Sequence, residues 1–490
     1  MTYELQSIAL RQYEGELLFL YGDEGSERNL PLSKKELAAV NQRRERDKNF
    51  ILSLDRLPYR LHLLSFDSER PAPEVQEGLR RMAAKLLPLL EQERVGTLAV
   101  SGEGTLPEEV MALVEGLTLA DYRFDRYLSK DVYHLQHVVI DSAFMRQEEL
   151  DASVRLWNRM YWCREWVNLP VQDLNAERFA DELQAIAADL EGVKCTVMDK
   201  RQIESLRMGG LLAVNRGSVD EPRFVVLEYN GISGRTGKTS KTGNSGTPIC
   251  LVGKGVMYDT GGLNIKPDDY MCEMKSDMAG AATMASVLFA AADNNLPVHL
   301  VALLPLTDNR PGFNAYAADD ILTMYDGTTV EVVNTDAEGR LILADAIAYA
   351  AKNYNPRLIV DAATLTGAAV RAISTFGIAA MQQGADNELT LMKLVGQQVY
   401  ERLVEFPMWK EYDELLKSDF ADLRNCGTTP QAGTITAGKF LAHFAGEVPY
   451  IHLDIAGVAY FSKPQPPYRT GASAYGVRLL YAFLQMQYKD

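Results

Sequence analysis

The stretch Asn334-Thr335-Asp336-Ala337-Glu338-Gly339-Arg340-Leu341 lies between two segments of different character. The β-branched run 329–333 before it is predicted to be a strand, and the alanine-rich run 341–350 after it a helix. Its charged residues therefore stand at a strand-to-helix junction, the place where open α/β sheets bind ligands. Side chains two apart on an extended segment project to the same side, so Asp336 and Glu338 are expected to share one ion. The plainer interpretation is that Asp336 caps the helix and Arg340 lies on the surface.

Predicted strands and helices alternate along the rest of the chain. This alternation predicts an α/β fold with two domains, the larger C-terminal one a mixed, largely parallel sheet flanked by helices. A chain of 490 residues is too long for one ordinary domain. Asn168-Leu169-Pro170 breaks a long predicted helix, so we place an N-terminal α/β domain at 1–165 and a C-terminal domain at 166–490. The strands are expected at 96–101, 134–140, 193–198, 223–229, 249–252, 298–304, 357–363 and 450–455, and the helices at 74–93, 147–166, 176–190, 279–294, 387–403, 433–444 and 472–485.

Composition narrows the class of protein. The net charge is −16 and no long basic run occurs, which disfavours a nucleic-acid partner. No segment is apolar enough to predict a membrane span, and the first residues lack the features of a signal peptide. The five cysteines are scattered along the sequence, and this spacing favours free thiols in a reducing compartment over a disulfide framework. These features predict a cytoplasmic protein.

Two other patterns are interpreted as structural. The run 231–239 resembles a phosphate-binding loop, but Ile232 stands where the first glycine is required and a strand follows in place of a helix, so we predict a flexible hairpin loop over 231–246. His134 and His137 form the only close histidine pair. In a strand they would face opposite sides, which favours a structural or surface role.

A second acidic group lies upstream of the opening stretch. The glycine-rich segment 253–267 follows a predicted strand and contains Lys254, Asp259 and Lys266, and Asp277 stands at a predicted helix start. Taken singly, these residues fit a helix cap and solvated lysines. Carboxylates that converge at neighbouring strand ends repel one another unless cations neutralise them. Oxygen ligands without histidine suit magnesium, manganese or zinc, and a bridging carboxylate can hold two ions for metal-assisted hydrolysis.

These motifs resemble the leucine aminopeptidase family of dinuclear metallopeptidases. The resemblance rests on segments 334–341, 253–267, 274–282, 363–368 and 452–457, in the order found in the family, and it covers the chain from about residue 160 to its end. It implies that the C-terminal domain is catalytic and that the N-terminal domain has an assembly or regulatory role.

The resemblance also implies a role for each site residue. Asp259 and Glu338 match the acids that bridge two divalent ions (zinc or manganese, with magnesium also considered). Lys254 and Asp277 match the other ligands of the tighter ion, and Asp336 matches the extra ligand of the more exchangeable one. Lys254 would have to lose its proton to act as a ligand.

The remaining implied roles concern catalysis and the substrate. Lys266 and Arg340 match the catalytic residues that are not ligands: Lys266 would stabilise the oxyanion, and Arg340 would hold a bicarbonate ion that carries the proton. The implied pocket for the first side chain consists of Met274, Thr364, Leu365 and Gly367. The implied activity is removal of the N-terminal residue, leucine or another apolar one, from peptides with a free N-terminus. The implied assembly is a homohexamer.

Three departures from the family pattern and three alternatives remain. Thr260 stands where serine is more usual, and segments 308–315 and 231–246 are less typical, which leaves the pocket rim uncertain. The alternatives are a scaffold protein of the same fold, a DNA-binding protein of that fold and a two-metal phosphoesterase. Chelation distinguishes an enzyme from a scaffold, and hydrolysis of an aryl phosphate would identify the phosphoesterase.

Overall fold

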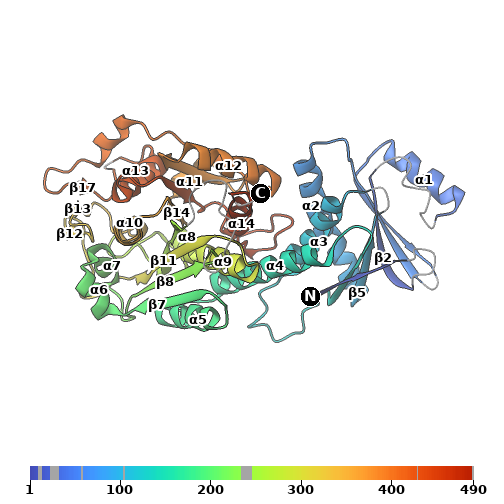
Figure 1. Ribbon diagram of the computed structural model, residues 1–490, viewed down its shortest axis with the longest axis horizontal. Coiled ribbons are helices and arrows are strands. Elements are labelled where there is room, and N and C mark those ends of the chain that lie inside the picture. The colour runs from blue at the N-terminus through green and yellow to red at the C-terminus, as the bar shows by residue number, and fades with distance from the viewer. Residues whose placement is uncertain are drawn as a thin grey trace. The chain divides into compact units, whose positions relative to one another are not determined.

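The computed structural model describes residues 1–8, 14–22, 32–56, 59–102, 105–232, 246–427 and 429–487 (Figure 1). The chain forms two compact units. Unit 1 comprises Met1–Asn158 and Phe461–Gly471, and unit 2 comprises Arg159–Tyr460 and Ala472–Asp490. Helix α4 (Gln147–Asn168) contains both the boundary between the units and the predicted limit at residue 165. The division at 165 stays a prediction.

Unit 1 is built on a six-stranded sheet with the order β1-β6-β5-β2-β4-β3, parallel except for the β3–β4 pair. Alternate residues of β2 and β4, such as Leu17, Phe19 and Leu63, pack with Val40 of α1 in one apolar cluster, as the two-residue period of a strand requires. Helices α2 and α3 lie side by side, because Gly116 lets α3 approach the backbone of Arg80. The elements are β1 (Thr2–Gln6), β2 (Gly15–Tyr21), α1 (Lys34–Arg44), β3 (Phe50–Asp55), β4 (Tyr59–Ser65), α2 (Ala72–Gln92), β5 (Thr97–Ser101), α3 (Pro107–Asp121) and β6 (His137–Asp141).

Unit 2 contains a nine-stranded sheet with the order β16-β15-β18-β14-β9-β11-β8-β7, with β10 also paired to β11. Its pairs are parallel except for β15–β18, β11–β8 and β7–β8, so the predicted mixed, largely parallel sheet is confirmed. The strands are β7 (Val193–Met198), β8 (Arg223–Asn230), β9 (Ile249–Gly253), β10 (Gly255–Asp259), β11 (His299–Asn309), β14 (Leu358–Ala363), β15 (Ile378–Gln383), β16 (Leu403–Glu405) and β18 (Tyr450–Asp454).

Helices cover both faces of this sheet. Cys250 and Val252 of β9 belong to the cluster formed with α10 and α13, whereas the buried Leu251 between them points to the opposite face. Helix α9 packs on β9, β11 and β14, and α14 packs on α9. Every residue of β9 is therefore buried. The helices are α5 (Ala176–Ala188), α6 (Lys200–Leu206), α7 (Gly209–Asn215), α8 (Asp268–Met271), α9 (Ala279–Asp293), α10 (Gly339–Tyr354), α11 (Gly367–Ile373), α12 (Asp386–Gln398), α13 (Gly433–Ala445) and α14 (Val477–Gln487).

The strand before the opening stretch does not belong to the large sheet. β13 (Thr329–Glu331) is shorter than predicted and pairs with β12 (Ile321–Thr323) and β17 (Leu423–Arg424) in a separate three-stranded sheet. The signature thus joins a small sheet to α10, while Asp259 lies at the end of β10, which pairs with β11 of the large sheet. The remaining short elements are the 3₁₀ helices Met274–Ser276 and Lys410–Leu416 and the strands β19 (Tyr460–Phe461) and β20 (Gly471–Ala472).

The helices predicted at 387–403 and 472–485 each differ from the structure by more than two residues at one end. The helix expected at 387–403 ends at Gln398, because Tyr400 adopts a left-handed conformation with φ of 59°. The helix expected at 472–485 begins at Val477, since Ala474 (φ 59°) and Gly476 (φ 101°) interrupt the backbone before it. No helix within the described ranges is long and apolar enough to cross a membrane.

Candidate metal centre

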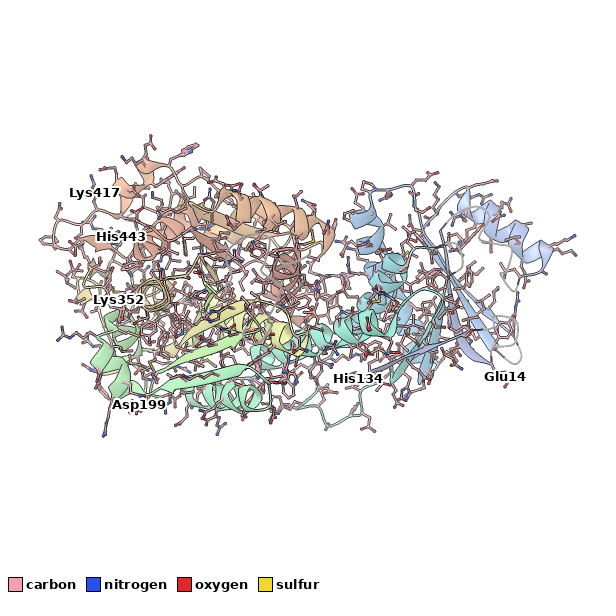
Figure 2. All side chains as sticks on the ribbon, viewed as in Figure 1. Glu14, His134, Asp199, Lys352, Lys417 and His443 are labelled. Carbon is pink, nitrogen blue, oxygen red and sulfur yellow. The ribbon has the colours of Figure 1, made fainter. Side chains whose placement is uncertain are left out.

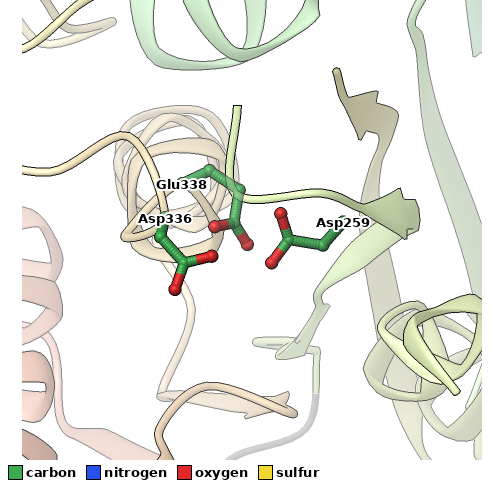
Figure 3. A group of neighbouring side chains, drawn as sticks. All are labelled: Asp259, Asp336 and Glu338. Carbon is green, nitrogen blue, oxygen red and sulfur yellow. The ribbon is translucent and has the colours of Figure 1, made fainter. Parts of the chain in front are cut away.

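Three carboxylates from different elements converge in unit 2 (Figure 3). Asp259 is the last residue of β10, Asp336 lies in the turn after β13, and Glu338 directly precedes α10. One oxygen from each lies within 4.8 Å of the others. The expected proximity of Asp336 and Glu338 is present, although a turn and not an extended segment produces it. Neither residue caps α10, because no side-chain cap bond is formed at Glu338 and Asp336 faces Lys266.

Lys254 connects Glu338 to the fourth predicted acid. Its Nζ lies 2.8 Å from Asp277 Oδ1 and 2.9 Å from Glu338 Oε1, and it donates to the carbonyl of Thr364 at 3.1 Å. Asp277 follows the 3₁₀ turn Met274–Ser276 and uses its side chain here, accepting from the Thr364 hydroxyl at 2.7 Å, and not as a helix cap. Lys254, Asp277 and Glu338 are almost fully buried.

Lys266 forms the matching contact on the other side of the cluster. Its Nζ lies 2.7 Å from Asp259 Oδ2 and 2.5 Å from Asp336 Oδ1. The turn that presents Lys266 needs Gly261 in a left-handed conformation (φ 85°), where a Cβ would come within 2.9 Å of Asp336 Oδ1. The structure therefore brings together all five predicted ligands and Lys266.

The carboxylates have too few cations around them. Burial, with the charge of Asp259 adding to it, raises the pKa of Glu338 to about 8. Burial also raises the pKa of Asp277 to about 6 and, together with Asp259, raises the pKa of Asp336. Four carboxylates share two lysines, so ionising all four acids is unfavourable, and a bound cation would relieve this condition.

The two lysines keep their protons in this arrangement. Burial opposes the charge of Lys254, but the carboxylates of Asp277, Glu338 and Asp259 together raise its pKa. The same balance of burial against nearby carboxylates raises the pKa of Lys266. A divalent ion placed beside Lys254 would reverse this balance, because a cation favours the neutral amine.

Two buried carboxylate oxygens of the cluster have neither a hydrogen-bond donor nor an ion-pair partner among the described residues. Asp277 Oδ2 and Glu338 Oε2 accept no hydrogen bond from any described residue. Burying a carboxylate oxygen without a hydrogen-bond donor costs free energy, and coordination to a metal ion would offset that cost. The donor set of carboxylates and one amine, with these open oxygens, fits divalent cations.

Polar residues that sequence reasoning did not assign hold the acids in place. Asn309, at the end of β11, donates from Nδ2 to Asp259 Oδ1 at 2.9 Å and to the Thr335 carbonyl at 3.0 Å. Tyr316 donates to the same carbonyl at 2.7 Å. The Thr335 hydroxyl donates to the carbonyl of Gly261 at 2.6 Å. These bonds connect the signature to the 259–266 loop. The strand predicted at 298–304 stopped short of Asn309, whereas β11 continues to it, so no sequence signal indicated this role.

Gly339 is required by the approach of Lys254. A Cβ at this position would lie 2.4 Å from Lys254 Cε, so any other residue would displace the lysine side chain. The glycine of the signature thus makes room for a predicted ligand.

Arg340 is buried and not on the surface. It donates from one Nη to the carbonyl of Asn425 at 2.9 Å, and its Nε has no partner among the described residues. Burial lowers the pKa of Arg340, opposed by nearby acids that include Glu338. The open Nε–H is a donor available to a small anion.

The predicted pocket residues border the cluster to different extents. Thr364 contacts it directly, through Asp277 and Lys254. Met274 and Leu365 are half-buried, and Gly367 is exposed at the start of α11. Thr260 uses the hydroxyl that it shares with serine, donating to the Asn309 carbonyl at 2.8 Å. In the atypical segment 308–315, Asp308 is buried and pairs with Arg310 at 2.7 Å, while Phe313 is fully exposed.

The histidine pair His134 and His137 and the predicted hairpin loop over 231–246 lie outside the sequence segments that form the carboxylate cluster. β6 begins at His137, so His134 (labelled in Figure 2) lies before the strand and is half-buried in unit 1. Its ring nitrogens contact Asp121 and Asp125. Most of the predicted hairpin loop, residues 233–245, lies outside the described residues.

Comparisons with known proteins agree with the site. A family model described as "Cytosol aminopeptidase family, catalytic domain" matches residues 161–481. A "Probable cytosol aminopeptidase" of Syntrophotalea carbinolica is 40% identical over 424 residues, which cover 84% of this chain and 82% of that protein. A protein of the same name from Chlorobaculum tepidum is 43% identical over 395 residues, covering 77% of this chain and 76% of the relative.

Solved structures extend the similarity to nearly the whole chain. The bottromycin maturation enzyme BotP in complex with Mn has a TM-score of 0.82 and 28% identity, with 96% of this chain and 99% of that chain covered. A mutant of tomato leucine aminopeptidase has a TM-score of 0.85 and 25% identity, with 99% and 96% covered.

Proposed function

Because this chain belongs to the cytosol aminopeptidase family and is a metal-dependent aminopeptidase acting on peptides, we propose a finer assignment of its site and substrate. The proposed reaction is removal of an N-terminal leucine or another apolar residue. The buried carboxylate cluster and its two unpartnered oxygens carry the proposal. The proposed ligands of two divalent ions are Lys254, Asp259, Asp277, Asp336 and Glu338.

Two ions bound there would supply an acidified water and a Lewis acid for the scissile carbonyl. Lys266 would turn its ammonium from Asp259 and Asp336 toward the oxygen that gains negative charge. The free Nε–H of Arg340 would hold a small anion, proposed to be bicarbonate, beside the reacting atoms to accept and return a proton. The negative charge of the cluster would attract the ammonium of a free peptide N-terminus.

Several finer points belong to the proposal. The half-buried Met274 and Leu365, with Thr364 and Gly367, are proposed to form the pocket for the first side chain, and their apolar character supports leucine or methionine. The BotP complex with Mn supports manganese as one of the ions; zinc and magnesium are the other candidates. The protein is proposed to be cytoplasmic and to form a homohexamer, with the N-terminal domain serving assembly or regulation. Membership of the family disfavours the scaffold, DNA-binding and phosphoesterase alternatives.

Two experiments test these points. Aminoacyl p-nitroanilides of leucine, methionine, alanine and aspartate, assayed with each metal in turn, should give the highest kcat/KM with leucine or methionine. A preference for aspartate would contradict the apolar pocket.

Light scattering should give a mass about six times the 54.5 kDa of the chain, and a monomeric mass would contradict the hexamer.

A further inference from the structure

A buried carboxylate outside the proposed ligand set lies beside the pocket loop. Asp454 ends β18 and is 1% exposed. Its register partner on the neighbouring parallel strand β14 is Ala363, the last residue before Thr364. The carboxyl ends of two adjacent strands therefore place Asp454 next to the loop 364–367.

The carboxylate accepts hydrogen bonds from that loop and from two residues outside it. Asp454 Oδ1 accepts from the backbone N–H groups of Leu365 at 3.2 Å, Thr366 at 3.4 Å and Ala456 at 3.2 Å. Asp454 Oδ2 accepts from the hydroxyls of Thr366 at 2.7 Å and Thr434 at 3.1 Å. One buried side chain thus fixes the loop to the start of α13, where Thr434 lies.

Thr366 extends this connection into α11. It is the N-cap residue of that helix, and its hydroxyl accepts from the N–H of Ala369 at 3.0 Å while it donates to Asp454. On the other side of Leu365, the Thr364 hydroxyl donates to Asp277. Leu365 is therefore held between a contact to the metal centre and a contact to Asp454.

We infer that Asp454, acting with the Thr366 hydroxyl, is a positioning residue that sets the enzyme's preference for the first side chain of the substrate. The inference rests on the proposed function, which assigns Leu365 and Gly367 to the wall of that pocket. Removing the carboxylate leaves the N–H groups of Leu365 and Thr366 without their acceptor, so the loop must move or admit water. A displaced wall no longer fits a large apolar side chain, while a small side chain loses little.

The test compares substrates that differ in the size of the first side chain. Leucine and alanine p-nitroanilides are assayed with the manganese-loaded wild type and with D454A, D454N, T366V and T366S. D454A and T366V are expected to lower the leucine-to-alanine ratio of kcat/KM by ~10-fold or more, the scale on which a pocket discriminates by methylene groups. T366S keeps the hydroxyl and should retain the wild-type ratio. D454N keeps one acceptor oxygen and should fall between the wild type and D454A.

A matched control separates positioning from general loss of a buried carboxylate. Glu401 is fully buried and accepts from the N–H groups of Gly476 and Leu479 at the start of α14. E401Q is expected to leave the ratio unchanged. Metal content, measured by elemental analysis, should equal that of the wild type in every variant.

The outcomes separate the inference from the function on which it rests. A wild type that hydrolyses neither substrate would overturn the proposed function and the inference with it. An active wild type, with an unchanged ratio in folded, metal-loaded T366V, would overturn the inference alone. If D454A does not fold, the comparison of T366V with T366S decides.

Discussion

At the scale of single residues, the site holds more carboxylates than the lysines Lys254 and Lys266 can neutralise. Lys254 and Lys266 each lie between two carboxylates, and Glu338 still has its pKa raised to about 8 by burial and by Asp259. A divalent ion bound in this cluster would offset the repulsion among its carboxylates.

Glu338→Ala should remove the carboxylate that faces both Lys254 and the acids around Lys266. We expect turnover of leucine p-nitroanilide to fall by ~10³-fold or more, the scale on which electrostatic groups of an active site act. The control is Glu411→Ala, an exposed glutamate far along the chain. Full activity in a folded E338A protein would refute the ligand assignment.

Lys266→Ala should lower kcat and leave the metal content nearly unchanged. The lysine contacts Asp259 and Asp336, but its proposed role is toward the substrate oxygen, so its loss is expected to cost ~10²-fold or more in kcat. Elemental analysis and kcat are measured on the same preparation. Loss of metal from K266A would contradict the role given to Lys266.

At the scale of elements, the start of α10 depends on close packing. Gly339→Ala would place a Cβ 2.4 Å from Lys254 Cε, and such overpacking costs ~1–3 kcal/mol. We expect a lower free energy of unfolding and weaker manganese binding, measured by denaturant titration and calorimetry. Gly78→Ala is the control, because a Cβ there meets nothing within 4 Å and alanine favours its helix, α2. Equal effects of the two substitutions would contradict the packing account.

His134, in the segment before β6, should make the stability of unit 1 depend on pH. His134 contacts Asp121 Oδ2 at 3.3 Å and Asp125 Oδ2 at 3.1 Å, and the hydrogen bond to Asp121, opposed by burial and aided by Asp125, raises its pKa. A raised folded-state pKa stabilises the fold below the unfolded value of ~6.5, and this stability is lost as the pH rises through the folded value.

His134→Gln should therefore lower the unfolding midpoint more at pH 6 than at pH 9. The control is His137→Gln, because the His137 ring contacts the Thr2 hydroxyl, which is an uncharged group. A midpoint difference between wild type and H134Q that is the same at both pH values would show that the ion pair contributes nothing.

At the scale of the whole molecule, the alternation of strands and helices predicted the α/β class and most elements of the large sheet, because apolar strands such as β9 and β14 are strong local signals. The acids of the centre were also predictable, since they occur in compact motifs. The placement of β13 in a separate sheet was not, because its partner β17 lies about ninety residues away in the sequence. Asn309, Tyr316 and Asp454 escaped assignment for the same reason: each acts through contacts with residues distant in the sequence, which leave no local pattern.

The most direct test of the account concerns the metal centre and the free substrate amine together. The protein is stripped with a chelator, manganese, zinc or magnesium is added back separately, and hydrolysis of leucine p-nitroanilide is compared with that of its N-acetylated form. We predict that chelation abolishes activity, that at least one ion restores it, and that the acetylated substrate is not cleaved. Activity that survives complete metal removal, or equal cleavage of the acetylated substrate, would contradict it.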